Sequence, residues 1–165
     1  MKIFVICLIA WFIAQLIKVI INLAKYLIAK SKGEKRKKVT IETLFKLGGM
    51  PSSHTATVIS LSASIGMHSG WNSDIFAVAG VFAFITMFDA IKVRLPMGRL
   101  TDAFLVVREM VLGKGQKKLK KVEGHTLPEV IGGFFVGAGV ALIILKFTPL
   151  FPEYVSIFET MSIFK

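Results

Sequence analysis

The sequence predicts an all-α integral membrane protein, a polytopic bundle of about four to five helices that forms a single domain over residues 1–165. The chain is 54% hydrophobic and has a mean hydropathy of +0.68, well above the usual composition of soluble proteins. It nevertheless carries a formal net charge of +11. The Lys and Arg residues lie between apolar blocks, which is typical of the loops of membrane proteins.

Residues 3–29 form the first expected span, an apolar run interrupted by few polar side chains. These interruptions are Gln15, Lys18, Asn22 and Lys25. The run is too long for the core of a signal peptide, and no small-residue cleavage site follows it. We therefore expect this segment to stay in the protein as a membrane anchor.

Further helices are expected along the rest of the chain. Residues 55–68 predict a helix that is short for a membrane span, which takes about 20 residues. Residues 75–91 predict a strongly hydrophobic helix, and the polar break KVRLPMGR separates it from an amphipathic helix over residues 100–112. Residues 127–148 predict the last span, and the segment 149–165 is expected to lie along the membrane interface.

The distribution of charge predicts the orientation of the helices. Lys and Arg crowd residues 30–46 and 92–121, whereas the turn MHSGWNSD has none. The positive-inside rule then places both basic loops in the cytoplasm and both termini outside, with four spans. The basic loops lack the interleaved aromatic residues that stack on bases, so nucleic acid is not an expected partner.

In this topology, polar residues from separate segments converge on the cytoplasmic membrane face. The stretch GGMPSSHTA opens the second helix there, and GHTLPE opens the last one. Ionisable residues near or inside a span are costly and usually mark a function. The candidate site residues are Lys18, Lys25, Ser52, Ser53, His54, Asp89, Arg94, His125 and Glu129.

These residue types suit phosphate chemistry. A helix N-terminus binds phosphate through free backbone N–H groups and the positive end of its dipole, and two such termini, at residues 51–54 and 125–129, are expected to meet. The serine hydroxyls add donors. The two lysines of the first helix and Arg94 can neutralise phosphate charge, and a guanidinium can bind two oxygens at once.

Two histidines would complete a phosphoryl-transfer site, since one can attack phosphorus while the other protonates the leaving oxygen. Glu129 follows His125 by one helical turn. Its carboxylate can hold one imidazole nitrogen, so that the other is presented as the nucleophile. No pattern of metal-ligating residues, such as a Cys pair or H-E-x-x-H, is present in the sequence.

The motifs resemble those of the type 2 phosphatidic acid phosphatase superfamily, which includes acid phosphatases and vanadium-dependent haloperoxidases. PSSHTA is similar to its P-S-G-H motif, and FDAIKVR, GRLTDA and GHTLPEVIGG resemble a divergent branch of small membrane proteins. The resemblance covers most of residues 15–140. It implies metal-independent hydrolysis of a phosphate ester without a cofactor.

The resemblance also implies roles for the residues of the second motif. Ser52 and the backbone N–H of Ser53 would bind phosphate, and His54 would be the general acid. Lys18 and Lys25 match the first motif, K-x6-R-P, with Lys in place of Arg and without the proline.

The third motif of the superfamily, S-R-x5-H-x3-D, is altered in this chain. Arg94 and His125 stand 31 residues apart instead of six, and Val93 replaces the preceding Ser. The end of the motif is kept as His125-x3-Glu129, with Glu in place of Asp. The resemblance then makes His125 the nucleophile and Glu129 its orienting acid.

Structural interpretations of the same residues stay open. Thr126-x-x-Glu129 is also a capping box, and either serine can simply cap the second helix. Asp89 can pair with Lys92 or Arg94. The lysines of the first helix can extend to lipid headgroups, and each histidine can be an ordinary polar residue at a helix start.

We therefore expect a membrane-embedded phosphatase that hydrolyses a phosphomonoester or diphosphate of a membrane lipid through a phosphohistidine at the cytoplasmic face. The alternative is a non-catalytic membrane protein that binds lipid headgroups or anions with a degenerate phosphatase site. The sequence leaves a homo-oligomer open.

Cysteine labelling tests the predicted orientation. In a Cys7→Ser background, Ser31→Cys and Ser69→Cys should react with membrane-impermeant reagents from opposite sides, because only the loop after Ser31 is basic. Reaction of both cysteines from one side would contradict the expected convergence on one face.

Overall fold

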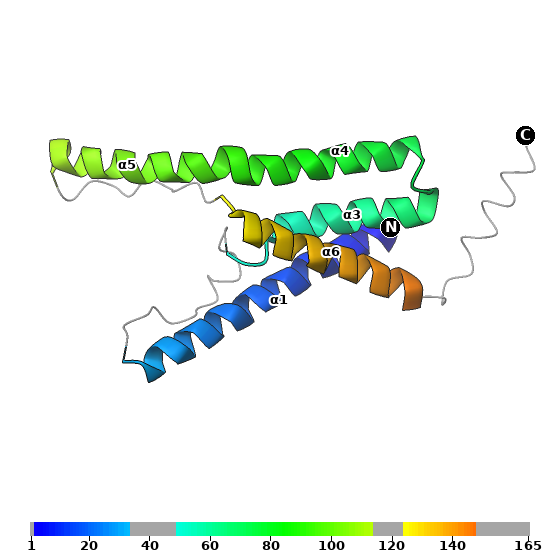
Figure 1. The fold of residues 1–165 in the computed structure, drawn as a ribbon, viewed down its shortest axis with the longest axis horizontal. Coiled ribbons are helices and arrows are strands. Elements are labelled where there is room, and N and C mark those ends of the chain that lie inside the picture. Colours follow the sequence, from blue (N-terminus) through cyan, green and yellow to red (C-terminus); the bar gives the residue numbers. More distant parts are fainter. Residues whose placement is uncertain (1, 34–48, 114–123, 148–165) are drawn as a thin grey trace, which may run out of the picture.

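The computed structural model describes residues 2–33, 49–113 and 124–147, and within these ranges the chain is helical without a β-strand. This confirms the predicted all-α membrane bundle. The elements in chain order are α1 (Lys2–Ser31), α3 (Ser53–Ser69), α4 (Asp74–Phe88), the π-helical turn η1 (Asp89–Arg94), α5 (Leu95–Leu112) and α6 (Leu127–Phe147) (Figure 1).

Three of the described helical stretches are long and apolar enough to cross a membrane. They are α1 with 30 residues, the continuous stretch from α4 to α5 with 39, and α6 with 21, against the roughly 20 residues that a span requires. The helix α3, with 17 residues, is shorter, as the sequence predicted. It packs against α1, α4 and α6 (Figure 1).

The hydroxyl groups of α3 are partly satisfied within the helix itself, which helps a serine-rich helix to lie among apolar neighbours. Thr57 Oγ1 donates to the carbonyl of Ser53 at 2.8 Å, and Ser60 Oγ donates to the carbonyl of Thr57 at 2.9 Å. The helix begins at the N-cap Ser52 and ends before Gly70, whose φ of 91° is readily adopted by glycine.

Glycines bring α6 directly against α3. A Cβ atom at Gly133 would overlap the carbonyl oxygen of Ser52, and one at Gly137 would overlap the carbonyl oxygen of Ala56. Gly137 follows Gly133 by four residues, and Ala56 follows Ser52 by four residues. The two helices therefore run side by side in the same direction. Small residues at a helix contact are the usual means of close approach in membranes.

Apolar clusters hold the other helices to this pair. Ile6 and Ala10 of α1 pack with Val140 and Ala141 of α6. Val58 and Ile59 of α3 pack with Ala83 of α4. Many large apolar side chains point outward instead, as expected for surfaces that contact lipid.

The predicted polar break between the third and fourth helices is wrong. The chain continues as one rod from Asp74 to Leu112, and the segment Asp89–Arg94 forms a π-helical turn within it. Pro96 lacks a backbone N–H and crowds the preceding turn, which normally breaks or kinks an α-helix. The widened turn directly before it lets the helix pass this proline without ending.

Two further expectations concern residues outside the described ranges. Of the two basic segments, residues 34–46 and 114–121 lie outside the described ranges, and the interfacial segment 149–165 is likewise not described. The predicted positions of these segments stay predictions.

A pair of glycines in α6 tests the helix contact. Gly137→Ala should lower the stability of the protein in detergent by about 1–3 kcal/mol, because the new methyl group must displace the backbone of α3. The matched control is Gly139→Ala, since a Cβ at Gly139 meets nothing within 4 Å. Equal thermal unfolding midpoints for the two variants would contradict the contact.

Candidate functional site

Two helix N-termini meet at one end of the bundle. The backbone N–H of Ser52, the N-cap of α3, donates to the carbonyl of Glu129 in the first turn of α6 at 2.9 Å. Each terminus carries the positive end of a helix dipole, and together they favour an anion near this end. The sequence predicted this meeting from the two polar helix entrances.

The segment that carries His125 is held against η1 by its backbone. The N–H of His125 donates to the carbonyl of Ala90 at 3.1 Å. A Cβ at Gly124 would overlap backbone atoms of Leu95 and Arg94, so only glycine allows this approach. The start of α6 is therefore fixed both to α3 and to the π-helical turn.

The carboxylate of Glu129 joins the His125 side chain to the helix cap. Glu129 Oε2 lies 3.2 Å from His125 Nδ1, and it also accepts the backbone N–H of Thr126 at 2.9 Å. Both interpretations of Glu129, capping and imidazole orientation, thus have a contact in the structure. With Nδ1–H directed at the carboxylate, Nε2 is the ring nitrogen that keeps a lone pair.

Burial is the largest influence on the pKa of His125, whose side chain is only slightly exposed, and it lowers this pKa, whereas the hydrogen bond and negative charge of Glu129 raise it. The positive charges of Lys18 and Arg94 lower the pKa further. The neutral imidazole is therefore the main form at pH 7, as a nucleophilic nitrogen requires.

His54 lies beside His125 in the first turn of α3. The centroids of the two rings are 6.2 Å apart, and their planes are inclined by 58°. His54 is exposed, whereas His125 has a relative exposure of 4%. A group bound at the exposed ring would lie within a few ångströms of both imidazoles.

Lys18 is a buried cation at this end of the bundle, with 2% of its surface exposed. Its side-chain carbons lie beside Gly49, which has a φ of 88° that favours glycine. Burial of a Lys is rare and costly, and it is commonly linked to a specific electrostatic role.

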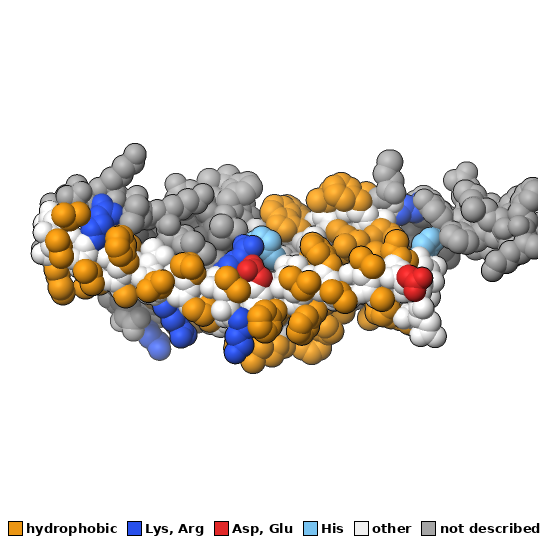
Figure 2. Space-filling view, turned by 90° about the horizontal axis from the view of Figure 1, so that it is seen from above, with side chains coloured by type: hydrophobic (Ala, Val, Ile, Leu, Met, Phe, Trp, Pro, Cys, Tyr) orange, Lys and Arg blue, Asp and Glu red, His pale blue; other side chains and the backbone are white. Residues whose placement is uncertain are grey.

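Arg94 and Asp89 form an ion pair across η1, in which Arg94 Nε donates to Asp89 Oδ2. The sequence left Lys92 and Arg94 as alternative ion-pair partners of Asp89, and in the structure the partner is Arg94. The Arg94 side chain is 48% exposed, so water weakens this ion pair. Figure 2 shows a group of basic, acidic and histidine side chains in the middle of a largely hydrophobic face.

The remaining predicted site residues are two buried serines and one exposed lysine. Ser52 is fully buried, and its Oγ accepts bonds from the backbone N–H and the hydroxyl of Thr55 at 3.3 and 3.0 Å. Ser53 is also buried. Lys25 is exposed and lies about 10 Å farther along α1 than Lys18, at 1.5 Å per residue.

Sequence reasoning missed the backbone groups that assemble the site. The carbonyl of Ala90 and the close approach of Gly124 have no side-chain signature of their own. The only available signal was the glycine directly before His125. Within residues 2–33, 49–113 and 124–147, no group of three or more His, Cys, Asp or Glu side chains is arranged to hold a metal ion.

Comparisons with known proteins bear on this arrangement. The model of the divergent PAP2 family, where PAP2 denotes type 2 phosphatidic acid phosphatase, matches residues 1–140, which include every candidate residue. YuiD, an uncharacterized membrane protein of Bacillus subtilis (strain 168), is 36% identical over 117 residues, covering 61% of this chain and 72% of that protein. No solved structure matches the chain.

Removal of Arg94 tests the anion site. Arg94→Ala should weaken binding of vanadate to the purified protein by about 1.5–3 kcal/mol, the range for a hydrogen bond to a charged group. Arg99→Ala removes the same charge five residues farther along the chain, in α5, and serves as the control. If both variants bind vanadate like the parent, Arg94 does not belong to the site.

Proposed function

The chain belongs to the divergent PAP2 family and is an integral membrane protein, and from this premise we propose that it is a membrane-embedded phosphatase. Its substrate is a phosphomonoester or diphosphate of a membrane lipid. The reaction proceeds through a phosphohistidine and needs no metal ion.

One arrangement carries this proposal, namely the neighbouring rings of His54 and His125 with Glu129 behind the second ring. A 3.2 Å contact orients His125, and the ring of His54 lies 6.2 Å away between centroids. A nucleophile held by an acid, next to a second proton-transferring group, is the pattern of covalent phosphoryl transfer. The positive charges of Lys18 and Arg94 act on the same histidine.

In the first step, His125 Nε2 attacks the phosphorus atom and forms an N–P bond while the bond from phosphorus to the leaving oxygen breaks. The protonated form of His54 gives its proton to that oxygen, so the alcohol or phosphate leaves in protonated form. The carboxylate of Glu129 stabilises the positive imidazole that results. The helix N-termini and the two cations stabilise the charge on the phosphoryl oxygens.

In the second step, water attacks the phosphorus of the phosphohistidine. His54 now accepts a proton from this water, and the N–P bond breaks to release inorganic phosphate and the neutral His125 ring. His54 is thereby reprotonated for the next cycle. The net reaction consumes one water molecule for each ester bond.

The proposal includes the side of the membrane on which the reaction occurs. The loops that follow α1 and α5 contain just over half of the Lys and Arg residues of the chain, whereas the turn between α3 and α4 has none. The positive-inside rule therefore supports a site on the cytoplasmic face.

A second candidate function is anion or headgroup binding without turnover, and the burial of two site residues favours it. Ser52 is completely buried and engaged with Thr55, which agrees with a purely capping role. His125 is 4% exposed, so substrate must reach a nitrogen that solvent scarcely contacts. Release of phosphate by the purified protein separates the two candidates.

Substitution of the two histidines tests the assigned roles. His125→Ala should abolish phosphate release from every substrate, because the nucleophile is gone. His54→Ala should slow hydrolysis of alkyl phosphates by about 10²–10⁴, the usual contribution of acid–base help. The His54 effect should shrink with an aryl phosphate, whose leaving group needs little protonation.

His68→Ala is the control, since His68 is an exposed histidine at the opposite end of α3. Turnover by His125→Ala at the parent rate would rule out the nucleophile. If the parent itself releases no phosphate from any lipid or soluble ester, the binding function replaces the enzyme.

A further inference from the structure

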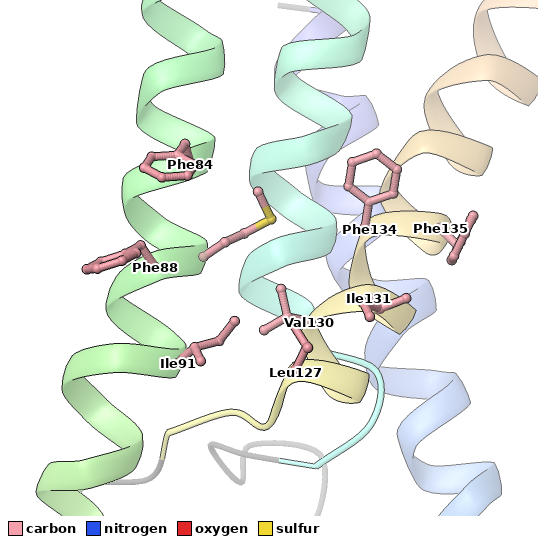
Figure 3. A pocket seen from close by; sticks show the side chains of 9 residues that line it. Phe84, Phe88, Ile91, Leu127, Val130, Ile131, Phe134 and Phe135 are labelled. Atoms are coloured by element: carbon pink, nitrogen blue, oxygen red, sulfur yellow. The ribbon is translucent and has the colours of Figure 1, made fainter.

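An apolar groove of about 380 Å³ lies between α4 with η1 on one side and α6 on the other (Figure 3). Every side chain that lines it is hydrophobic. The lining residues are Phe84, Met87, Phe88, Ile91, Leu127, Val130, Ile131, Phe134 and Phe135. The phosphate chemistry proposed for the candidate site does not use this groove.

One end of the groove adjoins the candidate site. Leu127 is two residues after His125, and Val130 directly follows Glu129. On the other wall, Ile91 follows Ala90, whose carbonyl accepts the backbone N–H of His125. The same backbone contact that positions the histidine thus joins the two walls of the groove.

From this end the groove extends along the apolar part of both helices. The lining of α6 from Leu127 to Phe135 spans about 12 Å, and that of α4 and η1 from Phe84 to Ile91 spans about 10 Å, at 1.5 Å per residue. Both stretches belong to helices long and apolar enough to cross the membrane. Phe84 and Phe135 are themselves exposed, as for side chains in contact with lipid.

A groove at this depth is surrounded by hydrocarbon rather than by water, so a hydrocarbon chain is its natural occupant. Its volume is at the lower end of the range for ligand pockets, about 300–1,000 Å³, which suits one chain better than several. The groove has no polar lining side chain that would hold a headgroup. The polar groups for a headgroup lie instead at its end, around His54 and His125.

We propose that this groove binds one hydrocarbon chain of the lipid whose phosphate is held between His54 and His125. The inference rests on the proposed function and deepens it, since it makes the substrate a long-chain lipid phosphate that enters sideways from the bilayer. Contacts with the remote chain then position the phosphorus atom for attack, so the chain contributes to the rate as well as to affinity.

Photo-crosslinking tests chain binding without requiring turnover. The probe is dodecyl phosphate with a diazirine at the end of the chain, and the reference is dodecanol with the same group. The phosphate probe should label peptides from residues 84–91 and 127–135 several-fold more than the alcohol, and vanadate should compete with it. Equal labelling by both probes would show that the groove binds hydrocarbon independently of the site and would overturn the proposal.

A matched pair of substitutions tests the effect on catalysis. Ile131→Trp fills the groove, whereas Ile143→Trp makes the same change at an exposed position of α6 that does not line it. Ile143 is turned by about 120° from Ile131 at 3.6 residues per turn. In Ile131→Trp the ratio of kcat/KM for dodecyl phosphate to that for ethyl phosphate should fall at least about tenfold, as expected for loss of about two buried methylene groups.

The results of these two experiments distinguish a failure of chain binding in the groove from a failure of the proposed phosphatase activity. An unchanged ratio in Ile131→Trp, or an equal fall in Ile143→Trp, would overturn the groove while leaving the phosphatase intact. A parent protein without turnover would contradict the phosphatase, and the crosslinking pattern would then decide whether the groove takes the chain of a bound lipid phosphate. Labelling confined to other segments would overturn that as well.

Discussion

Gly133 and Gly137 let the backbone of α6 lie against that of α3, and the other features of the site depend on this approach. Because the helices run in the same direction, their N-termini meet at one end, where the N–H of Ser52 donates to the carbonyl of Glu129. The contact brings His54 of α3 and His125 before α6 to neighbouring positions. A larger residue at either glycine would separate the elements that carry the two rings.

The continuous helix formed by α4, η1 and α5 is the second element that positions the candidate site. Its π-helical turn gives Arg94 and Asp89 to the site, and the carbonyl of Ala90 within it anchors the backbone of His125. The same turn forms one wall of the apolar groove through Ile91. Irregular turns of this kind are frequent at functional sites, since they redirect side chains and carbonyl groups that a regular helix would keep in line. The candidate site and the apolar groove thus share one structural support.

The parts that could be predicted from sequence are those with a local signal. The lengths of the apolar runs predicted α1 and α6, and the spacing of His125 and Glu129 placed them one turn apart. Pro96 within a polar stretch predicted a break, because local propensity says nothing of a widened turn that accommodates the proline. Neither the burial of Lys18 nor the apolar groove could be predicted from the sequence, because both result from the packing of helices that are distant in the chain.

The proposed phosphatase mechanism depends on a covalent bond between His125 and phosphorus. The most direct measurement is mass spectrometry of the purified parent protein, quenched in base during turnover of a lipid phosphate, since phosphohistidine is preserved in base. We expect a phosphoryl group on the peptide that contains His125. Turnover with the phosphoryl group on His54, or with no phosphorylated residue at all, would contradict it.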